Sequence, residues 1–179
     1  RPKITFPKPE EDTESDAEYR KISEVLSKSQ NHEYQIIPIL RARYIDLQEG
    51  LLRYRPVIIH FSGHGTELGE ICLEGDDGEL VNVSFDVLVN LLSQFSCIEC
   101  VVLNACYTQM KPSALKNIKC LIGTKDQISS SAAIDFAESF YQALFYGQKY
   151  ETAFNIAKNR LMVENKLDAD AFVIFLLRE

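Results

Sequence analysis

The stretch Val57-Ile58-Ile59-His60-Phe61-Ser62-Gly63-His64-Gly65 decides how this sequence folds and where its chemistry lies. It begins as a nearly all-apolar run, which is typical of a β-strand that is covered on both faces. The run ends at a histidine between two glycines, and glycine lets the chain turn sharply where a strand ends. A buried strand with a reactive side chain at its carboxyl end indicates an α/β protein with a site at the edge of its sheet.

A second apolar stretch, Cys100-Val101-Val102-Leu103-Asn104, ends in Ala105-Cys106. If the two strands are neighbours, His64 and Cys106 lie at the same edge of the sheet. An imidazole can take the proton of a nearby thiol, and the thiolate rather than the thiol is the nucleophile. We therefore predict that Cys106 is a nucleophile and His64 its general base. The backbone N–H groups of Gly65 and Cys106 are the candidates for an oxyanion hole.

The rest of the chain alternates between strand and helix patterns. Apolar spacing predicts helices at 16–29, 45–54, 131–146 and 150–165, and one more that Ser84 caps. Strands are expected at 3–6, 34–40, 57–62, 99–104, 120–124 and 171–177, and the last of these is expected to be buried. A hairpin is expected at 70–73 and 80–83, and a loop from Pro7 toward the first helix. This alternation predicts one three-layer α/β domain over residues 1–179, with a mostly parallel sheet and helices on both faces.

Composition limits the classes of function. With 179 residues, 46% of them hydrophobic, the chain can bury one sizeable core. A net charge of -7 argues against a nucleic-acid partner, because phosphate binding needs clustered Lys and Arg. No apolar run is long enough to cross a membrane, and no signal peptide opens the chain. Five cysteines without the spacing of a disulfide framework favour a reducing compartment, so we expect a cytoplasmic protein. The first residue, Arg1 rather than Met, is compatible with a fragment of a longer protein.

The segments His60-Phe61-Ser62-Gly63-His64-Gly65 and Leu103-Asn104-Ala105-Cys106-Tyr107 resemble the two signature segments of CHAT domains, which are bacterial caspase-like, clan CD cysteine peptidases related to separases. The histidine precedes the cysteine by 42 residues, near the roughly 50 of the caspase signature. The resemblance implies the caspase-hemoglobinase fold, a dyad of His64 and Cys106, and cleavage of protein substrates without a cofactor. It also implies regulation by a partner or by a fused module such as tetratricopeptide repeats.

One segment departs from the family's pattern. Many members carry an Asp that the resemblance links to recognition of a basic P1 side chain, and this sequence has Ser130 there. A carboxylate selects Lys or Arg by charge, and a serine cannot. A strictly basic P1 preference therefore does not follow, although Asp126 could substitute for the missing acid. Ser62 and Asn104, near the predicted edge, are further candidates for substrate contact.

Other interpretations of these residues stay open. The protein could be a catalytically silent module that uses the fold as a docking surface, although such a surface requires neither His64 nor Cys106. Cys97 and Cys100 form a single Cys-x-x-Cys, which suggests either redox sensing or, more simply, buried structural thiols. A structural zinc site needs four ligands, so we expect no metal. His60 fits a hydrogen-bonded core histidine as well as a support for the site.

Overall fold

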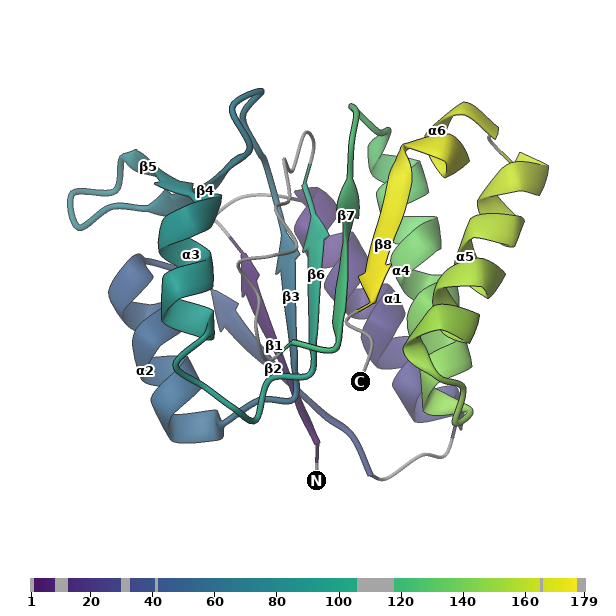
Figure 1. Ribbon diagram of the computed structural model, residues 1–179, viewed down its shortest axis with the longest axis horizontal. Coiled ribbons are helices and arrows are strands. Elements are labelled where there is room, and N and C mark those ends of the chain that lie inside the picture. The colour runs from purple at the N-terminus through teal and green to yellow at the C-terminus, as the bar shows by residue number, and fades with distance from the viewer. Residues whose placement is uncertain are drawn as a thin grey trace.

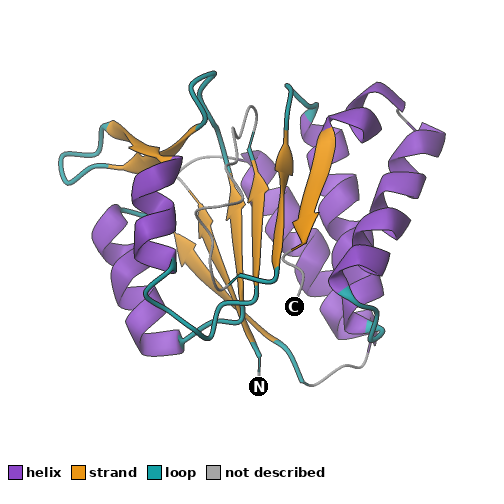
Figure 2. Ribbon diagram, viewed as in Figure 1, coloured by secondary structure: helices purple, strands orange, loops and turns teal. Residues whose placement is uncertain are grey.

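The computed structural model describes residues 2–8, 13–29, 33–40, 42–105, 118–164 and 166–176. A six-stranded sheet in the order β2-β1-β3-β6-β7-β8 forms its centre (Figures 1 and 2). The first five of these strands are parallel, and β8 runs antiparallel to β7. Their bounds are β1 (Lys3–Lys8), β2 (Gln35–Leu40), β3 (Ile58–Ser62), β6 (Cys100–Asn104), β7 (Cys120–Thr124) and β8 (Phe172–Leu176).

Helices cover both faces of the sheet, which confirms the predicted three-layer α/β architecture. One face packs against α1 (Thr13–Ser29), α4 (Ser130–Phe145) and α5 (Tyr150–Glu164). The other packs against α2 (Tyr44–Tyr54), α3 (Phe85–Leu92) and a hairpin of β4 (Glu70–Glu74) and β5 (Leu80–Ser84). A short helix, α6 (Lys166–Ala171), leads into β8. None of the described helices has the length and apolar character needed to span a membrane.

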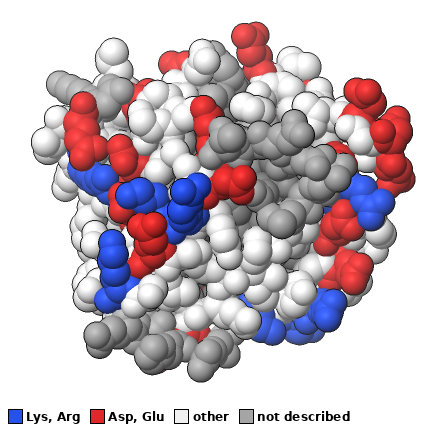
Figure 3. All heavy atoms as spheres, turned by 180° about the vertical axis from the view of Figure 1, so that it is seen from behind, with Lys and Arg blue, Asp and Glu red and all other residues white. Residues whose placement is uncertain are grey.

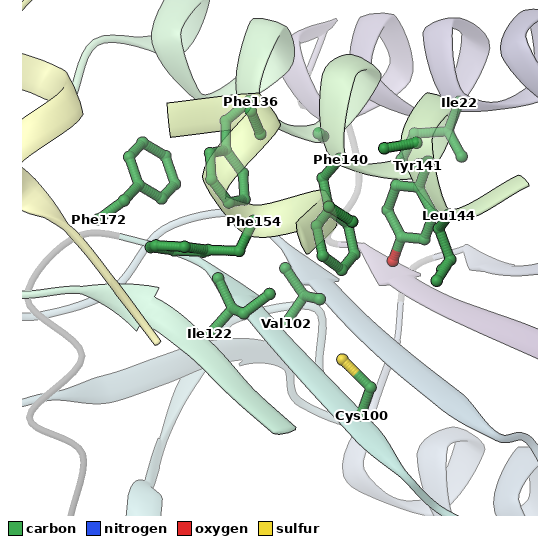
Figure 4. Close-up of a cluster of buried hydrophobic side chains, with 14 of the residues drawn as sticks. Ile22, Cys100, Val102, Ile122, Phe136, Phe140, Tyr141, Leu144, Phe154 and Phe172 are labelled. Carbon is green, nitrogen blue, oxygen red and sulfur yellow. The ribbon is translucent and has the colours of Figure 1, made fainter. Parts of the chain in front are cut away.

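Alternating side chains of the central strands enter two separate cores, as the two-residue period of a strand requires. On β3, Ile58 packs toward α1 and α4, whereas Ile59 and Phe61 pack toward α2 and α3. The first core is rich in aromatic rings (Figure 4), and the ring centroids of Phe136 and Phe172 lie 4.0 Å apart. His60 and Ser62 follow the period of Ile58, so two polar side chains enter the aromatic side of the sheet.

Local signals set the ends of several helices. The Ser84 hydroxyl accepts a hydrogen bond from the Val87 N–H at 3.4 Å, so the predicted cap of α3 is confirmed. Ser129 caps α4 in the same way, through the Ala132 N–H at 3.2 Å. Gly147, which follows the end of α4, has a φ of 84°, a backbone conformation that glycine adopts without strain.

Two sequence-based expectations were wrong, and one short helix was not predicted. Pro7 belongs to β1 and not to a loop, because β1 pairs with β3 only at Ile4 and Thr5 and continues beyond them against β2 alone. The last strand is a half-buried edge strand rather than a buried one, since β7 is its only neighbour in the described sheet. Helix α6 was not predicted, because six residues are too few to show a helical period.

Charged side chains of both signs lie close together on the face seen in Figure 3. Arg160 shows how such groups are paired, because it contacts Asp135 at 3.0 Å and Glu138 at 2.9 Å on α4 and Glu164 at 3.3 Å on its own helix. The surface charges thus act partly to connect neighbouring helices.

Candidate active site

The carboxyl ends of β3 and β6 lie side by side in the sheet. The two strands are parallel neighbours, and the last residues of each, Ser62 and Asn104, are partners in the register. The chain leaves β3 through Gly63, whose φ of 153° is strained for any other residue, and reaches His64. On the β6 side the described chain continues to Ala105, and Cys106 lies outside the described residues. The two strands are thus neighbours, which is the condition under which the sequence predicts both reactive residues at one edge.

A cavity of about 290 Å³ opens at this edge of the sheet. Its wall is formed by α1, the ends of β3 and β6, and the start of α4, through residues that include Glu14, Glu18, Ser62, His64, Asn104 and Ser130. A larger cavity of about 500 Å³ lies away from these strand ends and is lined by Arg43, Asp46 and Asp76, among others. In its wall Arg43 is already paired, at 2.8 Å from Asp46 and 3.1 Å from Asp76. We therefore assign the candidate site to the smaller cavity.

The loop that carries His64 is attached to the β4–β5 hairpin. The His64 carbonyl accepts a hydrogen bond from the Cys72 N–H at 3.2 Å, and the Thr66 N–H donates to Glu70 at 3.0 Å. Gly65 lies opposite Ile71 between these two bonds. Within the described chain its own N–H has no backbone acceptor. The His64 side chain is exposed and borders the cavity.

A buried carboxylate, Glu18 of α1, lies below the two strand ends and was not predicted. It is 2% exposed and accepts hydrogen bonds from Ser62 of β3 and Asn104 of β6. Its Oε1 lies 2.8 Å from Nε2 of His60, whose Nδ1 lies 3.0 Å from the hydroxyl of Tyr141 on α4. The sequence held a signal for this role, because Glu18 precedes Ile22 by one helical turn and therefore lies on the buried face of α1.

The other predicted residues lie in different surroundings. Ser62 and Asn104 border the cavity, but their side chains are buried and bonded to Glu18, and Asn104 also donates to the Ala133 carbonyl at 3.0 Å. Ser130 is half-buried and borders the cavity as the first residue of α4. Asp126 is exposed, accepts a bond from the Gln127 N–H at 2.8 Å, and is not part of the cavity wall. His60 is a hydrogen-bonded core histidine, which is one of the two interpretations that the sequence left open.

The cysteines of the described chain have structural surroundings. Cys97 packs against the core on the α2 and α3 side, whereas Cys100 is buried in the core on the α1 and α4 side. Cys100 lies opposite Cys120 in the register of β6 and β7, and burial raises the pKa of its thiol well above the ordinary value. A raised pKa disfavours the thiolate that redox chemistry and nucleophilic attack both need. The described residues contain no group of three or more His, Cys, Asp or Glu side chains that could hold a metal.

Both the sequence and the fold match known proteins. The family model of the CHAT domain matches residues 9–172. A Roc-COR-CHAT protease from an unknown prokaryotic organism is 24% identical over 135 residues, which cover 71% of this chain and 13% of that protein. Among solved structures, the secreted C11 cysteine protease iotapain from Bacteroides thetaiotaomicron superposes with a TM-score of 0.60 at 14% identity. That match covers 89% of this chain and 62% of the other, and it establishes a likeness of fold.

Proposed function

Because the chain belongs to the CHAT domain family, a group of caspase-like peptidases, we propose that it is a cysteine endopeptidase with Cys106 as nucleophile and His64 as general base. One observation carries the proposal. The ends of β3 and β6 are partners in the sheet, and the chain that leaves each of them borders one cavity. That arrangement brings the segments leading to the histidine and the cysteine to the same edge. A single domain over residues 1–179 is part of the same proposal.

In this mechanism His64 takes the proton of Cys106, and the thiolate attacks the carbonyl carbon of the substrate peptide bond. The N–H groups of Gly65 and Cys106 stabilise the oxyanion, an interaction worth about 3 to 4 kcal/mol per donor elsewhere. His64 then gives its proton to the leaving amine, and a thioester forms at Cys106. Water, deprotonated by His64, hydrolyses the thioester and releases the carboxylic acid and the free thiol.

The chemistry of the cavity wall favours substrates that bring hydrogen-bond donors. Among the described residues of this wall, the charged groups are the carboxylates of Glu14 and Glu18, and none is a Lys or an Arg. Within the part of the chain that the structure describes, the buried Oδ1 of Asn104 has no hydrogen-bond partner. A substrate carboxylate would face like charge here, whereas Lys or Arg would meet acceptors. We therefore propose that the P1 side chain of the substrate is basic or neutral and not acidic. In this proposal Ser130 borders the cavity that receives the P1 side chain, and Asp126 does not.

Regulation by another module is also proposed. The Roc-COR-CHAT protease is a much longer protein, and the aligned segment is 13% of its length. Its printed name joins the CHAT domain to two other modules. By analogy, we propose that a fused domain or a protein partner controls access of substrates to the cavity of this chain.

The experiment compares the wild type with Cys106→Ala on a peptide library randomised at P1, with cleavage sites read by mass spectrometry. The wild type should cleave after basic or neutral residues, and Cys106→Ala should lose all cleavage. Cys97→Ala is the matched control and should retain it, because Cys97 lies outside the cavity wall. If the wild type cleaves nothing and Cys106 reacts with iodoacetamide no faster than an ordinary thiol, the chain is a catalytically silent module.

A further inference from the structure

The buried carboxylate of Glu18 connects the two strands that lead to the reactive residues. Its Oε2 accepts a hydrogen bond from Ser62, the last residue of β3. Its Oε1 accepts one from Nδ2 of Asn104, the last residue of β6. Each of these partners is two residues from a member of the dyad, because His64 follows Ser62 and Cys106 follows Asn104 at that spacing. One side chain of α1 thus holds both strand ends at once.

The same carboxyl group also meets polar side chains of the core. Its Oε1 lies 2.8 Å from Nε2 of His60, whose Nδ1 lies 3.0 Å from the hydroxyl of Tyr141. The Ser62 hydroxyl lies between Glu18 and the buried Ser15, at 2.9 Å from the Ser15 hydroxyl. Glu18 is thus the central member of a buried polar network below the two strand ends.

The position of this carboxyl group does not follow from stability alone. β3 and β6 are already joined by their backbone ladder from Ile58 to Ser62, and the aromatic core packs below them. Burying a polar group costs free energy even when its hydrogen bonds are made inside the protein, so an apolar side chain could fill this place. Two of the partners of Glu18, Ser62 and Asn104, are instead the last residues of their strands. A group placed there bonds both strand ends at the point where the chain leaves the sheet.

We propose that Glu18 is a positioning residue that aligns His64 with Cys106 by holding Ser62 and Asn104 together. The proposal rests on the proposed dyad. Without the carboxylate, the ends of β3 and β6 shift relative to each other, and the imidazole no longer stabilises the Cys106 thiolate. Misplacement of a reacting group by about 1 Å can cost roughly a hundredfold in rate.

The test uses Glu18→Gln, which keeps the size of the side chain but places an amide N–H₂ where one oxygen accepted. The rate of Cys106 alkylation by iodoacetamide is followed by site-resolved mass spectrometry at pH 7 and pH 9.5. At pH 7 an unpaired thiol near pKa 8.5 is only about 3% thiolate, so alkylation should slow roughly tenfold after allowance for its higher nucleophilicity. At pH 9.5 the unpaired thiol is ionised as well, so the variant should no longer react more slowly than the wild type. The matched control is Glu24→Gln on the exposed face of α1, which should react like the wild type.

The outcomes separate this proposal from the proposed function. If Glu18→Gln lowers thermal stability but leaves Cys106 alkylation at pH 7 unchanged, Glu18 is structural only and the positioning role is overturned. If the wild-type Cys106 itself reacts like an ordinary thiol, the dyad is absent and the proposed function fails first. Should Glu18→Gln not fold, Ser62→Ala removes one donor to the same carboxylate. It should slow alkylation about threefold at pH 7, and an unchanged rate there overturns the proposal.

Discussion

At the scale of single residues, the surroundings of a side chain decide what it can do in this protein, so residues of the same type differ in their chemistry. His64 is exposed and borders the cavity, while His60, four residues earlier, is buried and bonded to Glu18 and Tyr141. Two histidines four residues apart thus have different surroundings, because alternate residues of β3 point to one face and the loop after it turns at Gly63. Thiols depend on their surroundings as well, because burial raises the pKa of Cys100 and makes it a poor nucleophile.

Substrate preference can be tested at Ser130, which borders the cavity at the start of α4. Ser130→Asp adds a carboxylate to that wall, and it should raise kcat/KM for an Arg-P1 peptide about tenfold relative to a Gln-P1 peptide, because a charged hydrogen bond is worth about 1.5 to 3 kcal/mol. The matched control is Ser131→Asp, one residue further along the helix, exposed and outside the wall. Equal effects of the two variants would show that Ser130 does not contact P1.

At the scale of elements, helix α4 connects the site to the rest of the fold. Its first residue borders the cavity, the Ala133 carbonyl binds Asn104, and Tyr141 binds His60. Its other side packs against α5, where Arg160 contacts two acids of α4. The orientation of this helix therefore determines both one wall of the cavity and the support below it.

The contribution of the Arg160 ion pairs can be measured as a change in the free energy of unfolding. Arg160→Met keeps the apolar part of the side chain and removes three ion pairs. Asp135 and Glu164 then lose this cation, whereas Glu138 keeps the more distant Lys21 at 3.7 Å. The free energy of unfolding in urea should fall by roughly 1 kcal/mol, since half-exposed pairs are individually weak and only the network adds up. Lys158→Met, on the same helix, should change it by less than about 0.5 kcal/mol. A salt titration should reduce the difference between the two variants.

Buried tyrosines make stability depend on alkaline pH. Burial raises the pKa of Tyr141 on α4 well above its ordinary value, and it raises the pKa of Tyr150 on α5 and of Tyr34 as well. The unfolded chain ionises these groups near pH 10 and the folded chain does not. Their contribution to stability is thus complete below about pH 9 and is lost as the pH rises above 10. Urea unfolding at pH 8.5 and 10.5 should show this fall.

Two tyrosine variants isolate that effect from other groups that titrate at high pH. Tyr141→Phe should make the loss of stability between pH 8.5 and 10.5 smaller than in the wild type. Tyr146→Phe, at a position with 64% exposure, should leave it unchanged. An identical fall in all three proteins would mean that the buried phenol is not responsible.

At the scale of the whole molecule, two cores share one sheet, and the aromatic one lies on the side of the buried polar network. The ring of Phe136 is fully buried and packs against Phe172, Phe140 and Phe154, with centroids at 4.0, 6.0 and 5.7 Å (Figure 4). These contacts join α4, α5 and β8. The C-terminal strand is therefore held by the same cluster that supports the sheet below the site.

Removal of that ring tests how far the fold depends on this cluster. Phe136→Ala should lower the free energy of unfolding by about 3 to 5 kcal/mol, the cost of lost burial plus the cavity that remains. Val163→Ala, at a position with 89% exposure, should change it by less than about 0.5 kcal/mol. Circular dichroism and tyrosine fluorescence should report one coincident urea transition in the wild type. Separate transitions would contradict the proposal of one domain.

Sequence patterns predicted most of the elements because their signals are local. The apolar runs at β3, β6 and β7 and the helical periods of α4 and α5 each lie within one segment, so their type and approximate bounds follow from the residues themselves. The failures have equally physical causes. Nothing within residues 171–177 distinguishes an edge strand from a central one, because that difference depends on which strands pair beside it. Pro7 could enter β1 because the pairing with β3 had already ended.

The sequence by itself determined the fold class and set His64 and Cys106 shortly after two apolar strand segments, since strand period, glycine turns and reactive residue types are all properties of short segments. The tertiary structure alone decided that β3 and β6 are neighbours and what lies beneath their ends. Glu18 is 42 residues from His60 and 86 from Asn104 along the chain, and no local pattern states that their side chains meet. Likewise, Ser130 borders the cavity and Asp126 does not, because the cap at Ser129 sets where α4 begins. A hydrogen bond needs two groups within about 3 Å, and only the packing of α1 and α4 on the sheet brings these groups that close.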